Sequence, residues 1–109
     1  MSQADEVEVK VRLLRALAFE IHRKRPAVEA MAECIEKEGQ RGRHRILRPA
    51  SAVLVTDGFV AALRQAGMLG EEAAVVLAAV VESGDHRLLA AAIGSLADYH
   101  AQAVAGDRW

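Results

Sequence analysis

The sequence predicts an all-α domain built as a six-helix antiparallel bundle, and three observations lead to this prediction. The 109-residue chain contains 22 alanines and two prolines, so helix propensity is high along nearly its whole length. Apolar residues recur at spacings of three and four, and no stretch alternates apolar and polar residues as a half-buried strand does. Glycines and prolines divide the chain into short segments, and their close spacing predicts neighbouring antiparallel helices.

The first two helices are predicted over residues 5–23 and from Pro26 to Gly39. Proline fits the first position of a helix because its missing N–H would have no partner there, and glycine commonly follows a helix end. The predicted apolar stripe of the first helix is Val7, Val11, Leu14, Ala18 and Ile21. The stripe of the second is Val28, Met31, Ala32 and Ile35.

Pro49 limits where the third helix can begin. Proline interrupts a helix unless it lies in the first turn, so either this helix begins near Arg48 or it contains a kink. We favour a start between Arg45 and Pro49, with Val53 and Leu54 buried. A turn at residues 57–58 precedes the fourth helix, which ends near Gly67 and Gly70. Its predicted buried residues are Phe59, Val60, Leu63 and Met68.

The fifth helix begins at Glu71 and Glu72, where acidic groups suit the positive end of the helix dipole. Residues 73–81 are apolar on every side, which predicts a helix that is buried all round or contacts a partner. Gly84 ends it, and Asp85 is the expected N-cap of the last helix. That helix is predicted to bury Leu88, Leu89, Ala92, Ile93, Leu96 and Tyr99.

Length and composition indicate one domain over residues 1–109, with tails at about 1–5 and 106–109. The net charge of −1 gives no overall attraction to nucleic acid or anionic lipid. Neither a signal peptide nor a stretch of about 20 apolar residues is present, so we expect a cytoplasmic protein.

No arrangement of residues predicts catalysis, a cofactor or a well-formed metal site. Cys34, the single cysteine, lies in an apolar stretch and is predicted to be a partly buried core residue. The four histidines include no pair at helical spacing, so each is expected at the surface. Glu82 and Asp85, with Asp98 as a third, are weak candidate ligands for a hard cation, which needs about six oxygens.

Two basic segments at opposite ends of the second predicted helix are the strongest electrostatic feature. They are residues 23–25 and 41–48, and the candidate partner-binding residues are Arg23, Lys24, Arg25, Arg43, Arg45 and Arg48. Three interpretations remain open: solvated loops, a contact for an acidic protein or membrane surface, or a nucleic-acid site. Aromatic residues that would stack on bases do not accompany these segments.

The residues between the predicted helices resemble a known family. Gly58 with Ala62-Leu63, then Val80-Val81-Glu82-Ser83-Gly84, and finally Ser95-Leu96-Ala97-Asp98-Tyr99 are similar to the cytoplasmic domain of the type II secretion system F protein. That family includes the inner-membrane platform protein of type IV pilus assembly. The resemblance covers residues 11–102, because residues 14–19 and 28–31 look like its opening two helices.

This resemblance implies a non-catalytic scaffold domain at the inner face of the bacterial inner membrane, either excised from a longer protein or a free-standing relative. Its implied partners are the assembly ATPase and neighbouring platform components. From the residues themselves we also expect a homodimer, formed through the apolar residues Val76, Val80, Leu88 and Leu89. Glu82 is assigned to the turn between the last two helices, and Tyr99 to packing at the end of the bundle. The alternative function is a small regulatory nucleic-acid-binding protein that uses residues 41–48.

Overall fold

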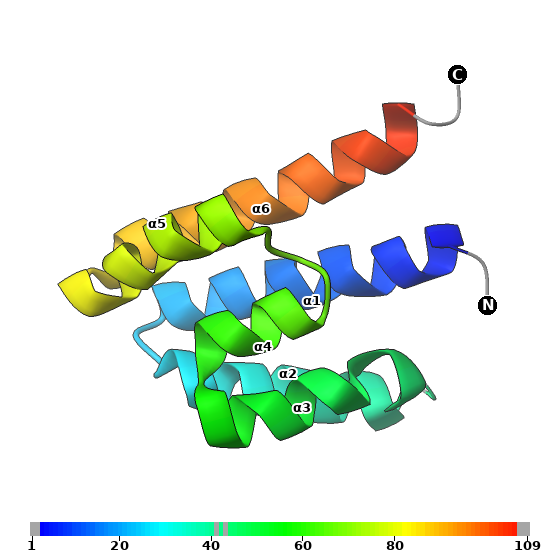
Figure 1. The fold of residues 1–109 in the computed structure, drawn as a ribbon, viewed down its shortest axis with the longest axis horizontal. Coiled ribbons are helices and arrows are strands. Elements are labelled where there is room, and N and C mark those ends of the chain that lie inside the picture. Colours follow the sequence, from blue (N-terminus) through cyan, green and yellow to red (C-terminus); the bar gives the residue numbers. More distant parts are fainter. Residues whose placement is uncertain (1–2, 41, 43, 107–109) are drawn as a thin grey trace.

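The computed structural model describes residues 3–40, 42 and 44–106, and side chains at 6–40, 42 and 47–103. These residues form six helices and no strand, which confirms the predicted all-α bundle (Figure 1). The helices are α1 Gln3–His22, α2 Ala27–Gln40, α3 His44–Asp57, α4 Phe59–Gln65, α5 Glu71–Ser83 and α6 His86–Gly106. None of the described helices is both long and apolar enough to cross a membrane.

Helix α1 lies at the centre of the molecule. Along one side it packs against α6, which runs in the opposite direction, and this is the most extensive helix pair in the fold (Figure 1). Along its other side it packs against α2, which in turn contacts α3. The short helix α4 contacts α2, α3 and α5, and α5 lies on the outside next to α6. The first and last helices of the chain therefore close the bundle together.

The central position of α1 changes which of its residues are buried. The fully buried residues are Val9, Leu13, Leu14, Leu17 and Ile21. Of the predicted stripe, only Leu14 and Ile21 are fully buried, whereas Val7, Val11 and Ala18 are half-buried, so the predicted stripe was partly wrong. A helix that contacts neighbours on two sides buries a wider face, and its centre falls at Leu13 and Leu17.

Helix α2 shows the same kind of correction. Met31 and Ile35 are buried as predicted, but Val28 is 46% exposed and Ala32 is also exposed. Ala30 and Cys34 take their places in the core because α2 contacts α1 and α3 on different sides. The buried face is thus rotated relative to the predicted one.

Pro49 lies inside α3, and the prediction that this helix begins no earlier than Arg45 was wrong by one residue. The helix begins at His44, so Pro49 falls in its second turn and removes the N–H that would bond to the carbonyl of Arg45. Leu47 and Ala50, which flank it, are nearly fully buried. Packing of these side chains offsets the loss of one backbone hydrogen bond.

The connection between α5 and α6 has the conformation that the sequence predicts. Gly84 ends α5 in the left-handed conformation, with φ of 73°, which glycine adopts without strain. Asp85 Oδ1 accepts a hydrogen bond of 3.0 Å from the backbone N–H of Leu88, so Asp85 is the N-cap of α6 as predicted. In α4 and the turn after it, Phe59, Leu63 and Met68 are buried, also as predicted, and Val60 is half-buried.

A buried carboxylate joins α1 to α2. Arg12 Nε lies 3.0 Å from Glu38 Oε1, and the Glu38 side chain is only 5% exposed. An apolar core disfavours a charge unless an opposite charge or hydrogen bonds accompany it, and the ion pair with Arg12 supplies one such partner to Glu38. A second arginine of α1, Arg15, pairs with Asp98 of α6 at 3.1 Å, but the side chains of Arg15 and Asp98 are both more than half exposed.

These two ion pairs give a matched test of buried against exposed charges. We expect Arg12→Ala to lower the free energy of unfolding by about 1–3 kcal/mol, because it removes a charge-assisted contact from a buried carboxylate. Arg15→Ala should cost less than about 1 kcal/mol, as exposed pairs do. Chemical denaturation of both variants measures the difference, and equal losses would show that burial of Glu38 is not decisive.

Candidate interaction surface

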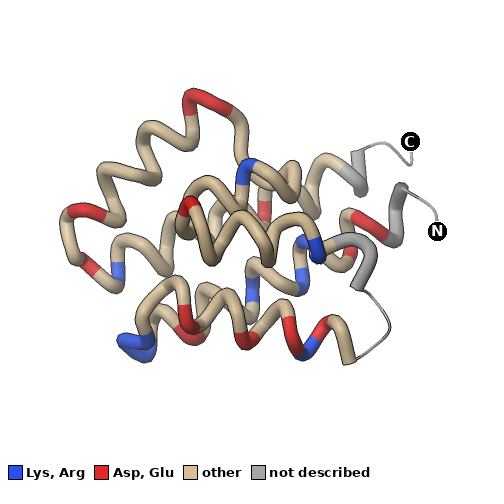
Figure 2. Tube along the Cα trace, turned by 60° about the horizontal axis from the view of Figure 1, so that its bottom comes forward, with Lys and Arg blue, Asp and Glu red and all other residues tan. Residues whose placement is uncertain are grey.

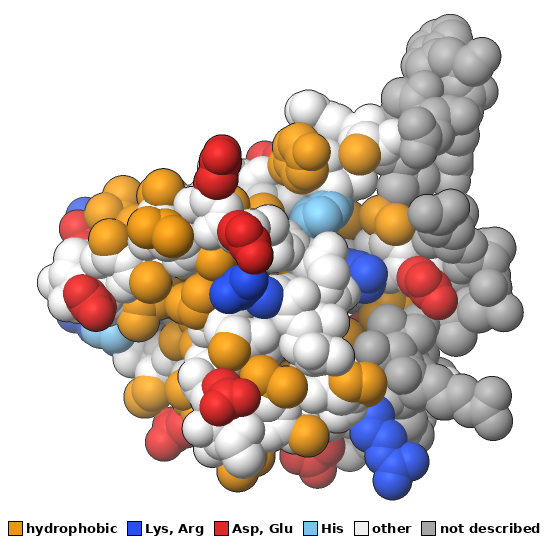
Figure 3. Space-filling view, in the orientation of Figure 1, with side chains coloured by type: hydrophobic (Ala, Val, Ile, Leu, Met, Phe, Trp, Pro, Cys, Tyr) orange, Lys and Arg blue, Asp and Glu red, His pale blue; other side chains and the backbone are white. Residues whose placement is uncertain are grey.

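The outer side of α5 and the adjoining part of α6 present large apolar residues to solvent. Val75 is 72% exposed, Val76 65%, Leu88 49% and Tyr99 67%. Figure 3 shows hydrophobic side chains gathered over α5. We call these four residues the α5–α6 face. Other exposed apolar residues, such as Phe19 and Val55, lie on different helices and are scattered singly.

A groove runs along this face between the two helices. Its volume is about 420 Å³, and its lining is almost entirely apolar. The residues that line it include Leu69, Ala73, Val76, Val80, Leu96 and Tyr99, and Ser95 adds a hydroxyl. An apolar groove with exposed apolar rims is the kind of surface that soluble proteins use to bind other proteins.

The groove is open because α5 contacts the bundle through a narrow stripe. Ala74 and Leu77 are its buried residues, while Val80, Val81 and Ala78 are half-buried. A helix that is apolar on every side but buried on only one leaves the rest of its apolar surface in water. Of the two interpretations of residues 73–81, burial all round is therefore wrong, and contact with a partner stays a prediction.

Three of the four predicted self-association residues lie on this surface. Val76 and Val80 line the groove, and Leu88 is half exposed on α6, one turn before Ala92, which lines the groove. Leu89 is 7% exposed and belongs to the core, so the prediction was wrong for this residue. The two leucines are adjacent in a helix, and 100° of rotation places one outside and the other inside.

Tyr99 does not cover the end of the bundle, contrary to prediction. It is 67% exposed, and its ring meets the ring of His100 edge to face, with 5.5 Å between centroids. His100, predicted at the surface, is half-buried, and its Nε2 lies 2.8 Å from the carbonyl oxygen of Met68. His22 and His86 are exposed as predicted, and the side chain of His44 lies outside the described residues.

The turn between α5 and α6 is held by Ser83 and not by Glu82. Ser83 Oγ donates to the carbonyl oxygen of Val80 at 2.6 Å and accepts from the backbone N–H of Asp85 at 3.2 Å. Glu82 is exposed. Asp85 caps α6 and Asp98 pairs with Arg15, and within the described residues no three acidic, histidine or cysteine side chains gather as a metal site would require.

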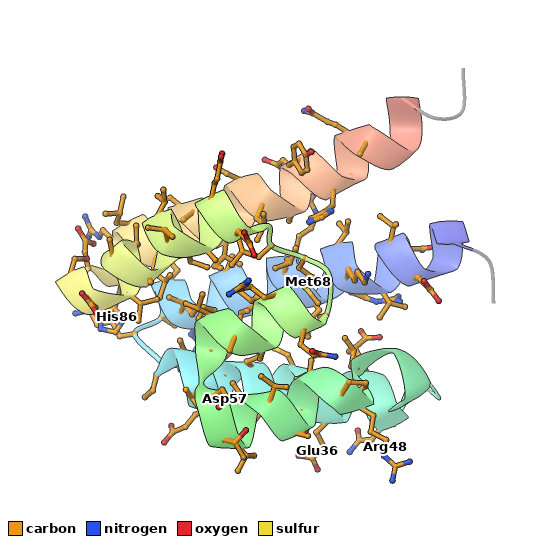
Figure 4. The ribbon with its side chains drawn as sticks, viewed as in Figure 1. Glu36, Arg48, Asp57, Met68 and His86 are labelled. Atoms are coloured by element: carbon orange, nitrogen blue, oxygen red, sulfur yellow. The ribbon has the colours of Figure 1, made fainter. Side chains whose placement is uncertain are left out.

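The predicted basic residues do not form one patch. Arg23, Lys24 and Arg25 lie at the turn before α2 (Figure 2), whereas Arg48 lies on α3, beside Glu36 in the C-terminal half of α2 (Figure 4). Arg48 is exposed and borders a cleft of about 500 Å³ together with Glu36 and Ser51. Arg43 and the side chain of Arg45 lie outside the described residues.

Arg25 is bound to its own domain. It forms ion pairs with Glu20, at 3.0 Å, and with Glu33, which also pairs with Lys37. Hydrogen bonding to Glu20 and Glu33 raises the pKa of Arg25, and the hydrogen bond from Arg25 lowers the pKa of Glu33. The neighbouring Arg23 lies over the ring of Phe19, 5.5 Å from its centroid. Arg25 therefore braces the α1–α2 turn, a structural role that sequence spacing did not reveal.

Cys34 is buried between α2 and its neighbours, with 6% of its surface exposed, as predicted. Burial raises the pKa of its thiol, since the charged thiolate would lose contact with water. The raised pKa and the burial make it a poor nucleophile.

Comparison of the chain with protein-family models, with curated proteins and with solved structures gives no match. The resemblance to the secretion platform family accordingly remains a prediction carried by the residues given above.

The Arg25–Glu33 pair predicts a pH dependence of stability. Because the pKa of Glu33 is lowered in the folded state, its contribution is fully present above the ordinary glutamate pKa and is lost as the pH falls through the lowered pKa. We expect Glu33→Gln to lower the melting temperature at pH 7, and the effect to shrink progressively as the solution is acidified below the ordinary glutamate pKa. Glu36→Gln, an exposed glutamate on the same helix, should not change the melting temperature, and equal effects of the two variants would contradict the assignment.

Cys34 predicts slow thiol chemistry. We expect the native protein to react with a thiol reagent at least about tenfold more slowly than the protein in denaturant, because reaction requires local opening of the core. Ala52→Cys places an exposed thiol on α3 as the control. Equally fast reaction at Cys34 would show that this part of the core opens readily.

Proposed function

We propose that this chain is a non-catalytic protein-interaction domain that self-associates through the α5–α6 face. The observation that carries this proposal is the apolar groove of about 420 Å³ with Val76 and Val80 in its lining, together with the exposed Leu88 on the neighbouring helix α6. Removing apolar surface from water contributes about 25 cal/mol per Å², so covering this face is favourable. The core beneath it is rich in alanine and leucine, and each small side chain buries little area, so association would add substantially to its stability.

The biological role that we propose is a scaffold of the kind implied by the resemblance to the type II secretion F family. In such a role the α5–α6 face joins copies of the domain, and the exposed basic residues Arg23, Lys24 and Arg48 remain available to acidic partners such as assembly components. These basic residues lie outside α5 and α6, in the α1–α2 turn and on α3, which supports this division.

Oligomeric state tests the proposal directly. We expect light scattering coupled to gel filtration to show a dimer at about 10–100 μM. Val76→Asp should weaken association at least about tenfold, which corresponds to 1.4 kcal/mol, because a carboxylate would have to be buried in an apolar contact.

Val55→Asp is the matched control. Val55 is 84% exposed on α3, far from the groove in the fold, so this variant should dimerise like the wild-type protein. Both variants should keep the wild-type melting temperature of the monomer. A monomeric wild-type protein at 100 μM, or equal weakening by the two substitutions, would overturn the proposal.

A further inference from the structure

The connection between α4 and α5, residues 66–70, is fixed to α4 through Met68 (Figure 4). Gly67 adopts the left-handed conformation, with φ of 73°, and the backbone N–H of Met68 donates to the carbonyl oxygen of Leu63 at 3.0 Å. This is the Schellman arrangement that ends many helices. The Met68 side chain is itself buried, so its backbone N–H and its side chain both hold the connection in place.

His100 of α6 binds the remaining polar group of Met68. Its Nε2 lies 2.8 Å from the carbonyl oxygen of Met68, and the contact is partly buried. A carbonyl oxygen can only accept, so Nε2 carries the hydrogen and donates it. Lys10 of α1 lies over the same turn, with its Nζ 3.2 Å from the position that a Cβ would take at Gly67. The connection is therefore contacted by α1 and α6 as well as by α4.

The bond between His100 and Met68 joins the neighbours of two residues that line the apolar groove. Leu69 follows Met68 on the connection and lines the groove where α5 begins. Tyr99 precedes His100 on α6, lines the groove as well, and meets the ring of His100 edge to face. A fixed distance between His100 and Met68 therefore limits how far Leu69 can move away from Tyr99.

Helix α5 has a small buried surface of its own. Its buried residues are Ala74 and Leu77. Its ion pair with α4, from Arg64 to Glu71 at 3.5 Å, is exposed, and exposed pairs contribute little to stability. Elements with few buried apolar residues open at a lower free energy than the core of the same protein.

Glycines lie at both ends of α5. Gly70 precedes the helix in an extended conformation, and Gly84 follows it in the left-handed conformation. Residues at the ends of an element absorb the backbone rotation when that element moves as a unit. Rotation at these two positions would carry α5 away from α6 without unwinding either helix.

From these contacts we infer that the bond between His100 and Met68 is a latch, which sets the width of the groove, and that α5 separates from α6 as one unit when the latch breaks. Separation exposes Ala74 and Leu77, so the apolar surface that a partner can contact depends on the latch. His100 is thus a positioning residue for the groove. The inference goes beyond the proposed self-association, because it concerns a single copy of the chain.

Native-state hydrogen exchange of the α5 amides tests the latch. His100→Leu removes the donor, and we expect exchange of α5 to rise about five- to tenfold, because the closed state loses a hydrogen bond. His100→Gln should bring the rate back to within about twofold of wild type, because a glutamine side-chain amide also donates. All proteins are compared at about 1 μM, where mass action disfavours association.

Arg12→Ala is the matched control for a general loss of stability. It removes the ion pair with Glu38 between α1 and α2, and separation of α5 alone does not break that pair. This variant should therefore lower the free energy of global unfolding but change the exchange of α5 by less than about twofold.

Each outcome decides the inference. Faster exchange of α5 in His100→Leu, with rates near wild type in His100→Gln and Arg12→Ala, supports the latch. A rise in Arg12→Ala as well would show that α5 opens only when the whole domain unfolds, and would overturn it. Unchanged exchange in His100→Leu, or equally fast exchange in His100→Gln, would show that the hydrogen bond does not hold α5. A monomer by light scattering would overturn the proposed self-association and leave this inference standing.

Discussion

The antiparallel packing of α1 against α6 is the contact on which the rest of this fold depends. It brings together the two ends of the chain and buries Leu13, Leu17 and Ile93, all of them almost inaccessible to solvent. Because α6 covers one side of α1 and α2 covers the other, little surface of α1 is left for α5 to pack against. Helix α5 therefore rests on the outside of the bundle through Ala74 and Leu77, and the exposed apolar face is a consequence of how the bundle closes.

The distribution of charge follows from the same arrangement. Three of the seven described Lys and Arg residues on α1, α2 and the turn between them bind carboxylates from other parts of the domain: Arg12 pairs with Glu38, Arg15 with Asp98, and Arg25 with Glu20 and Glu33. Basic residues that are neutralised in this way contribute little to an external electrostatic contact. The α5–α6 face, by contrast, is apolar, and its four residues stay exposed to solvent in the described domain.

The sequence predicted where the helices lie better than which way they face. The glycines between helices and the acidic residues at helix starts correctly predicted that α5 begins at Glu71 and that Asp85 caps α6. Helix ends and caps depend on neighbouring residues in the sequence, so they can be predicted locally. The buried sides of α1 and α2 were rotated relative to prediction, since the direction of a buried face depends on neighbours that are distant in the sequence. Tyr99 and His100 show the same limit: their adjacent positions gave no sign that the histidine would approach Met68 while the tyrosine stayed exposed.

The sequence feature that pointed to the candidate surface is residues 73–81, which are apolar on every side. This pattern allowed two positions for the helix, in the centre of the core or at the surface against a partner. Residues 73–81 could have been a central core helix, in which case Val75 and Val76 would be buried like Leu17. Their exposure, at 72% and 65%, excludes that position within the described fold. Helix α5 already packs on the bundle through Ala74 and Leu77, so Val75 and Val76 bury no further apolar surface within their own domain. Any gain must come from a contact outside the domain.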